Sequence, residues 1–286
     1  MSEEEKMDET EVATEAEAEP EEDEVSLDEF VRLNERRANT YGLLSRLFLK
    51  EVDGTLLRQL RGMRFPAATG NKTLDKGQHL MVGYLSNVWE NSLTELSLDF
   101  TRTFMGSGMT GFSAAYPFES VYTSEKRLLM QDARGEVLAI YRSNGLNKKD
   151  SWKEGEDHVS AELEFEQIMA ERTAEALKHG KEELAAKYLK TSLNFLEDHL
   201  LAWVPMMTAD IRKMCKTDFY KGLSYMVNGF LAVDRDLLQD VLTPPEGEEG
   251  EDAQDAGEGE EAQDETRDEA EAEESQEEAQ EEAQDD

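Results

Sequence analysis

Apolar residues recur at three- or four-residue steps through most of residues 26–243, a spacing that places side chains on one face of an α-helix. The recurring positions are Tyr41, Leu44 and Phe48; Leu85, Trp89, Leu93, Leu96, Phe100 and Phe104; Leu189, Leu193, Leu196, Leu200 and Trp203; and Phe219, Leu223, Met226, Phe230, Val233, Leu237 and Val241. The strict apolar–polar alternation that is typical of strands is absent. The pattern therefore predicts an all-α fold.

Local signals predict where the helices begin and end. Ser26 and Glu29 have the spacing of a capping box, which starts a helix. Glycine, proline and polar residues predict breaks near residues 65–70, 106–117, 145–155 and 214–217. The stretch 26–243 is long enough for one sizeable core and has no solenoid repeat. We therefore expect a single globular bundle of many helices rather than a four-helix rod.

Charge divides the chain into three parts. The 286 residues include 66 acidic and 30 basic residues, which give a formal net charge of −36. Residues 1–24 hold 13 acidic residues and one basic residue, and residues 246–286 hold 22 acidic residues and one basic residue. Neither segment has enough apolar surface to offset its ordering entropy, so we predict disordered acidic tails at 1–25 and 244–286 around a helical domain at 26–243. Such tails either maintain solubility or act as electrostatic arms toward basic peptides.

Composition excludes several classes of protein. The central part has a net charge of only −3, which argues against an acid-coated halophilic surface and leaves no basic excess for direct binding to nucleic acid. A single cysteine, Cys215, excludes an internal disulfide and fits a reducing cytosol. No apolar run approaches the ~20 residues of a membrane span. We therefore expect a cytoplasmic protein.

A glycine motif at residues 106–111 reads GSGMTG, which matches the dinucleotide-binding pattern G-x-G-x-x-G. That site requires a strand before the glycines and a helix directly after them. Here a helical pattern precedes the motif and Pro117 follows it closely. We therefore do not predict a nucleotide site at these glycines.

Metal and nucleophile chemistry have equally little support. A di-iron bundle needs Glu-x-x-His on two helices, and neither His158 nor His199 has a glutamate three residues earlier. With no H-E-x-x-H motif and no cysteine pair, we predict no metal and no other cofactor. Cys215 has no recognisable base partner, so we interpret it as a partly buried structural thiol and predict no catalytic residue.

Two adjacent arginines, Arg36 and Arg37, have the form of a twin-arginine export signal. Such a signal needs an uncharged apolar run after the arginines, and Arg46 interrupts the run that follows here. We interpret the two arginines as a surface pair on the first helix.

An acidic loop that contains Glu154, Glu156, Asp157 and His158 precedes a predicted long helix. In one interpretation Asp157 is the helix N-cap, and the glutamates favour the positive end of the helix. In the other, the loop is an acidic rim that receives a cationic ligand. Spacing alone leaves both interpretations open.

Three segments carry a family resemblance over about residues 30–242. They are residues 99–104 (DFTRTF), residues 116–122 (YPFESVY) with 128–130 (LLM), and residues 154–158 (EGEDH) with Glu162 and Phe165. With these segments the chain resembles the TorD, DmsD and NarJ-like chaperones of complex molybdoenzymes, and most of all the TorD/DmsD branch. Gly155 stands where the family's E-P-x-D-H loop has proline, and glycine is expected to loosen this loop.

The resemblance implies an all-helical protein that is not an enzyme and carries no redox cofactor. Such chaperones bind the twin-arginine signal peptide of a molybdopterin oxidoreductase catalytic subunit precursor, and they delay its export until its cofactor is inserted. Some members are described as domain-swapped dimers, so a homodimer stays open here. Others are described as weak binders of guanine nucleotides, a property that we do not carry over to this glycine motif.

The acidic loop is the candidate site for the arginines of such a signal, because guanidinium groups pair with carboxylates in bidentate geometry. The predicted site has an acidic rim, a histidine that orients Asp157 or completes a helix cap, and an aromatic wall for an apolar groove: Glu154, Glu156, Asp157 and Glu119; His158; and Tyr116, Phe118 and Tyr122. The alternative function is an acidic-tailed helical protein that binds another basic partner.

Overall fold

The computed structural model describes residues 26–66, 68–106, 114–149 and 151–243. The predicted acidic tails and most of the glycine motif lie outside these residues. Within them there is no β-strand, and the one strand-like contact is an isolated antiparallel bridge between Phe118 and His158. The predicted all-α fold is confirmed.

Helical segments make up most of the described residues. In chain order they are α1 (Leu27–Leu49), α2 (Gly54–Gly62), α3 (Lys72–Ser86), α4 (Ser92–Phe100), the π-helix η1 (Thr101–Met105), α5 (Glu119–Thr123), α6 (Asp132–Ser143), α7 (Val159–Lys178), α8 (Glu182–Phe195), the π-helix η2 (Leu196–Leu200), α9 (Leu201–Met214) and α10 (Asp218–Leu242). The four breaks predicted from the sequence all fall between helices.

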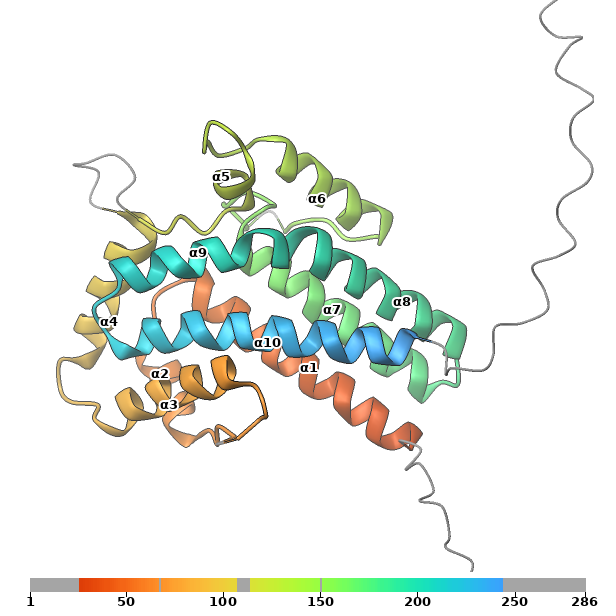
Figure 1. Cartoon of the computed structure of the whole chain (residues 1–286), viewed down its shortest axis with the longest axis horizontal. Coiled ribbons are helices and arrows are strands. Elements are labelled where there is room, and N and C mark those ends of the chain that lie inside the picture. The colour runs from red at the N-terminus through yellow and green to blue at the C-terminus, as the bar shows by residue number, and fades with distance from the viewer. Residues whose placement is uncertain (1–25, 67, 107–113, 150, 244–286) are drawn as a thin grey trace, which may run out of the picture. The chain divides into compact units, whose positions relative to one another are not determined.

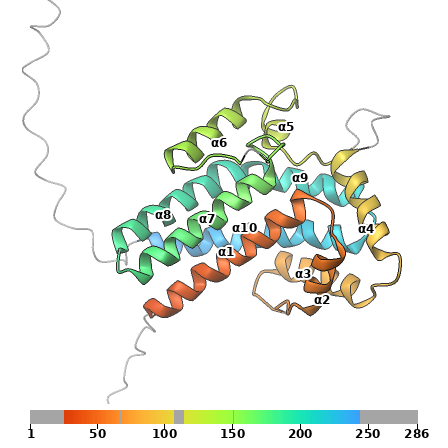
Figure 2. The same ribbon diagram turned by 180° about the vertical axis from the view of Figure 1, so that it is seen from behind.

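The long helices form the centre of the helical domain (Figures 1 and 2). Helix α1 packs along α7, which also contacts α8, and α10 packs against α8 and α9. Helix α3 covers one side by packing on α10, whereas α5 packs on α9 and carries α6 with it. The acidic loop between α6 and α7 is thereby placed beside the segment that leads into α5.

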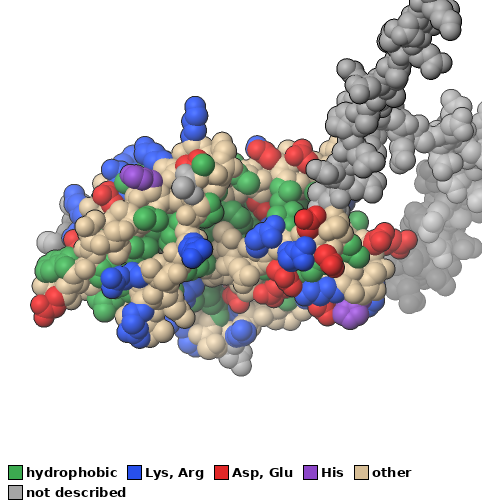
Figure 3. Space-filling model, turned by 90° about the horizontal axis from the view of Figure 1, so that it is seen from below, with side chains coloured by type: hydrophobic (Ala, Val, Ile, Leu, Met, Phe, Trp, Pro, Cys, Tyr) green, Lys and Arg blue, Asp and Glu red, His purple; other side chains and the backbone are tan. Residues whose placement is uncertain are grey.

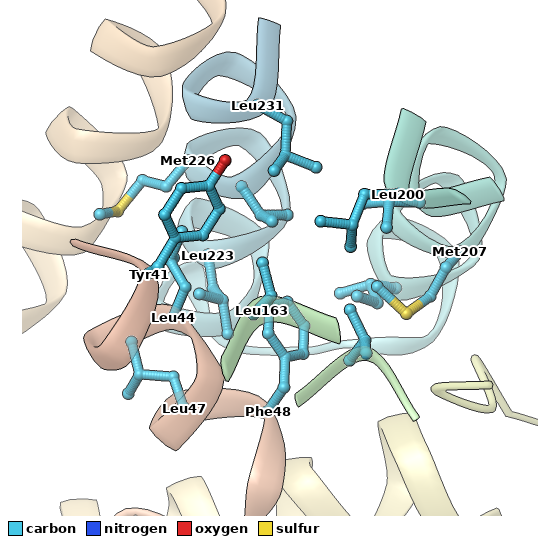
Figure 4. Packing of buried hydrophobic residues seen from close by; sticks show 14 of the residues in the cluster. Tyr41, Leu44, Leu47, Phe48, Leu163, Leu200, Met207, Leu223, Met226 and Leu231 are labelled. Atoms are coloured by element: carbon cyan, nitrogen blue, oxygen red, sulfur yellow. The ribbon is translucent and has the colours of Figure 1, made fainter. Parts of the chain in front are cut away.

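The core lies where the apolar faces of these helices meet. In Figure 4, Phe48 of α1, Leu163 of α7, Leu200 of η2 and Leu223 of α10 point toward one another, and all four are buried. Trp203, on the helical face predicted for residues 189–203, is fully buried. Burial of such large side chains is the main favourable contribution to folding.

Helix α1 begins as predicted. The Ser26 side chain accepts a hydrogen bond from the Glu29 backbone N–H, and the Glu29 side chain accepts one from the Ser26 N–H, which completes the capping box. The two groups thus satisfy backbone donors that an uncapped helix end leaves without partners.

One predicted helical face is wrong. The apolar series from Leu85 to Phe104 crosses a break at residues 87–91, and Trp89 in this break is 57% exposed. The Asn87 side chain donates to the carbonyl of Gly83, and the Ser92 hydroxyl accepts from the backbone N–H of Trp89. Short polar side chains therefore satisfy backbone groups on both sides of the break, and they compete with helix continuation.

The interpretation of Arg36 and Arg37 as a surface pair is wrong for Arg37. Arg36 is exposed, but Arg37 is buried and pairs with Asp234 of α10, with its Nε 2.6 Å from Oδ1 and its Nη2 2.9 Å from Oδ2. The hydroxyl of Tyr41 donates to the same carboxylate at 2.7 Å. The carboxylate that makes burial of this charge tolerable lies 197 residues away in the sequence.

Helices α3 and α10 approach each other at glycines. A Cβ added at Gly77 of α3 would lie 2.5 Å from the backbone nitrogen of Met226, and one added at Gly229 of α10 would lie 2.4 Å from the backbone nitrogen of Leu74. Gly222 of α10 faces the Gly77 carbonyl in the same way. These glycines therefore set the distance between the two helix backbones.

Charged side chains are unevenly distributed on the helical domain. The view in Figure 3 shows Lys and Arg side chains over the half that holds α2 and α3, whereas Asp and Glu side chains gather toward the opposite end.

Candidate functional site

The acidic loop and the segment around α5 lie side by side, as the shared family segments suggested. The backbone N–H of Glu119 donates to the carbonyl of Asp157, and that of Val159 donates to the carbonyl of Pro117. The Asp157 carboxylate accepts hydrogen bonds from both the backbone N–H and the hydroxyl of Ser120, in the first turn of α5. Asp157 therefore joins the start of α5 to the start of α7.

His158 is the N-cap of α7, because its Nδ1 accepts a hydrogen bond from the Ser160 N–H at 3.1 Å. The interpretation of Asp157 as that cap is wrong, and the alternative in which His158 completes the cap is confirmed. Burial lowers the pKa of His158 to about 4, so the ring is neutral at pH 7 and can accept this hydrogen bond.

A buried cluster of ionisable groups lies beneath the loop. Glu119 of α5 contacts Nδ1 of His199 at 3.1 Å, and the π-helix η2 presents this histidine. The Trp203 indole N–H donates to Glu162 at 2.9 Å. Burial, followed by the nearby Glu119 carboxylate, raises the pKa of Glu162 well above its ordinary value. Glu119 and Glu162 are therefore internal groups that hold α5, α7 and α9 together.

Glu156 is bound by two cations, Arg134 of α6 and Lys148 of the loop. Lys148 Nζ lies 3.1 Å from Oε1, and Arg134 Nε pairs with Oε2. Burial would raise the pKa of Glu156, but the hydrogen bonds from Arg134 and Lys148 outweigh it and lower the pKa to about 2. The Glu156 side chain is 5% exposed, whereas its two partners are 36% and 40% exposed.

The low pKa of Glu156 predicts a pH-dependent contribution to stability. Its folded-state value of about 2 lies below the ordinary 4.5, so the stabilisation is complete above pH 4.5 and is lost as the pH falls toward 2. We expect Glu156→Gln to lower the free energy of unfolding by roughly 1–2 kcal/mol at pH 7, because the partly exposed partners are screened by water. In denaturant titrations at pH 7, 4 and 3, the difference in free energy of unfolding between wild type and Glu156→Gln should become smaller as the pH falls. The exposed Glu90→Gln is the control, and a gap that stays constant with pH would contradict the assignment.

Glu154 and Gly155 differ sharply in exposure. Glu154 is exposed, and among the described residues its carboxylate has no hydrogen-bond or ion-pair partner. Gly155 is buried, and a Cβ added there would lie 2.7 Å from Oδ1 of Asp157. The glycine at the family's proline position therefore makes room for the Asp157 carboxylate, a role that the expectation of a looser loop did not include.

The three predicted aromatic residues are half-buried. Phe118 packs edge-on against the ring of His158, with the centroids 4.9 Å apart, and Tyr122 stacks on Trp203 at 5.6 Å. These contacts tie the α5 segment to α7 and α9. None of the three aromatic residues is among the residues that line the pocket described next.

A pocket of about 390 Å³ opens beside the acidic loop. Its wall is formed by the end of α1, by α6, by the loop and by α7, and its lining residues are Leu49, Tyr141, Leu146, Asn147, Lys148, Lys149, Ser151, Trp152, Glu156, Ala161, Glu164, Phe165 and Ile168. The sequence did not predict this wall, because the spacing of apolar residues identifies the buried face of a helix but not that of a loop. The two apolar residues of the loop, Leu146 and Trp152, were its only local signal.

The remaining candidates for chemistry are explained by packing. Cys215 is half-buried, and burial followed by the nearby Asp99 raises the pKa of its thiol to about 11, which confirms it as a structural thiol. Within the described residues, no group of three His, Cys, Asp or Glu side chains is arranged to hold a metal ion. None of the described helices has the length and apolar composition needed to cross a membrane.

Comparison with known proteins agrees with this arrangement. The family described as nitrate reductase delta subunit matches residues 70–209, which include the acidic loop and the α5 segment. The chaperone protein TorD of Vibrio atlanticus is 28% identical over 211 residues, which cover 72% of this chain and 95% of that protein. TorD of Vibrio parahaemolyticus is 26% identical over 220 residues, which cover 74% of this chain and 99% of the relative. The chain is therefore a distant homologue of the TorD chaperones and of the nitrate reductase delta subunit family, the NarJ-like group, and the similarity extends over nearly the full length of the TorD proteins.

Proposed function

We propose that this chaperone binds the twin-arginine signal peptide of a molybdopterin oxidoreductase precursor at the mouth of the pocket beside the acidic loop. Glu154 and Glu156 receive the arginines, and the apolar run of the signal lies in the pocket as a helix. Binding holds the precursor back from export until its cofactor is inserted. The family binds molybdoenzyme precursors, which supports this class of partner.

The observation that carries the proposal is the position of Glu156. This carboxylate lines an apolar pocket whose wall includes Leu146, Trp152 and Ile168. A twin-arginine signal has the complementary order of chemistry, with two guanidinium groups followed by an apolar run. The carboxylate and the apolar wall are thus adjacent in the protein, just as the arginines and the apolar run are adjacent in the signal peptide.

The other predicted site residues hold the acidic loop and α5 in place. Asp157 and His158 fix the loop to α5 and α7, and Glu119 fixes α5 to His199. Tyr116, Phe118 and Tyr122 belong to the same half-buried layer. We propose that these six residues position Glu154 and Glu156, since only small exposed areas of them are available to a peptide.

Peptide titration tests the proposal. We expect a twin-arginine signal peptide to bind wild type more tightly than the same peptide with two lysines, because guanidinium pairs bidentately with carboxylate. Glu154→Gln should weaken binding roughly two- to fivefold, and Glu156→Gln roughly tenfold or more because its carboxylate is buried. Glu90→Gln is the exposed control.

Equal affinity for the arginine and lysine peptides would overturn the proposal. The alternative, a helical protein that serves another basic partner, predicts that the full chain captures ribosomal or chromosomal proteins and no molybdoenzyme precursor.

Ordering the signal peptide on binding is expected to consume roughly 2–5 kcal/mol of the contact energy, so we expect a moderate affinity.

A further inference from the structure

Lys148 occupies a distinctive position at the mouth of the pocket. Its Nζ lies 3.1 Å from Oε1 of Glu156 and 3.4 Å from the backbone carbonyl oxygen of Glu154. One cation thus touches a carboxylate oxygen and a main-chain carbonyl at the same time. Two acceptors of this kind, side by side, also suit the fork of a guanidinium group, which offers several N–H donors in one plane.

We propose that Lys148 is a placeholder for the first arginine of the bound peptide, and that binding exchanges its ammonium for the incoming guanidinium. This inference rests on the proposed function, and it adds a residue that sets affinity and selectivity. In the free chaperone Lys148 neutralises Glu156. In the complex it gives way, so only a cation that pairs better than an ammonium gains from binding.

The two cations at Glu156 differ in a way that selects Lys148 for exchange. Lys148 lines the pocket, whereas Arg134 belongs to α6 and is not among the lining residues. Lysine pairs as a compact, strongly hydrated point charge on a flexible stem, so it leaves a carboxylate more easily than a guanidinium does. Arg134 stays in place and keeps one Glu156 oxygen occupied while the other becomes available.

The exchange predicts opposite effects for two substitutions at the same position. Lys148→Met removes the competing charge but keeps an unbranched side chain, and we expect it to tighten binding of the twin-arginine peptide roughly two- to fivefold. Lys148→Arg installs a better internal competitor, and we expect it to weaken binding by a similar factor. Isothermal titration with the arginine and lysine forms of one signal peptide measures both effects.

A matched control separates exchange from a general change of charge. Lys190→Met removes the same charge from an exposed position on α8 that does not line the pocket, and we expect its affinity to stay within a factor of two of wild type. The thermal midpoint of each variant, measured alongside, establishes that the folded state is retained.

The outcomes distinguish this inference from the proposed function. Suppose that wild type prefers the arginine peptide, but Lys148→Met binds it with unchanged or lower affinity. This result would overturn the placeholder role and leave the proposed function standing. Wild type with no preference for arginine would overturn both. Tighter binding by Lys148→Met together with weaker binding by Lys148→Arg would support the exchange.

Discussion

Asp234→Ala is expected to lower the free energy of unfolding by about 3–5 kcal/mol, because it leaves the buried guanidinium of Arg37 without its carboxylate. Arg37 is 4% exposed, and both oxygens of Asp234 accept its hydrogen bonds. Burial alone would lower the pKa of Arg37, but Asp234 raises it, so the arginine stays charged. The substitution also removes the acceptor of the Tyr41 hydroxyl. Denaturant unfolding at pH 7 measures the loss.

Two further variants test whether the unpaired charge causes this loss. Arg36→Ala alters the exposed neighbour and is expected to change stability by less than about 0.5 kcal/mol. The double substitution Arg37→Met with Asp234→Leu removes both charges and should be less destabilising than Asp234→Ala alone, since no buried charge remains. A double variant as unstable as the sum of Arg37→Met and Asp234→Leu would show that the two residues are not coupled, and would contradict the unpaired charge as the cause of the loss.

Gly77→Ala and Gly83→Ala are expected to change stability in opposite directions although both glycines lie in α3. The methyl group at Gly77 would meet the Met226 backbone nitrogen at 2.5 Å, and backbone cannot move aside as a flexible side chain can. We expect a loss of about 1–3 kcal/mol. At Gly83 nothing lies within 4 Å of the added methyl group, so the better helix propensity of alanine should stabilise the protein by about 0.5–1 kcal/mol.

This pair of variants contains its own control, because helix propensity contributes equally to both. The difference between the two free energies of unfolding therefore reports the close approach of α3 and α10 alone. Equal stabilities would mean that the two helices lie farther apart than the structure shows. A third variant, Gly229→Ala, probes the other end of the contact, where the added methyl group would meet the Leu74 backbone.

The helices were largely predictable from local signals. The periodic apolar face of residues 219–241 corresponds to α10, and the capping box at Ser26 begins α1. Periodicity failed between Leu85 and Phe104 because apolar spacing carries across a short break, whereas the capping hydrogen bonds of Asn87 and Ser92 decide whether the helix continues. Apolar periodicity and capping residues both act between residues a few positions apart, so both can be recognised in the sequence without knowledge of the fold.

The candidate site was predictable in its location and less so in its detail. The sequence predicted that the acidic loop and residues 116–122 belong together, and the bridge between Phe118 and His158 joins them. It did not predict that Asp157 and Glu119 are buried, because their partners Ser120 and His199 are identified only by the folded chain. It also missed the pocket wall at Trp152, since no periodicity describes a loop.

The amino-acid sequence by itself determined the helical class, the apolar faces, the acidic ends of the chain and the segments that mark the family. These properties follow from composition and from spacings of three or four residues. Only the tertiary structure decided which charges are buried, which two cations pair with Glu156 and where a pocket opens. Such properties depend on groups far apart in the sequence, as with Arg37 and Asp234, and a charge can be buried only where a distant partner offsets its loss of hydration.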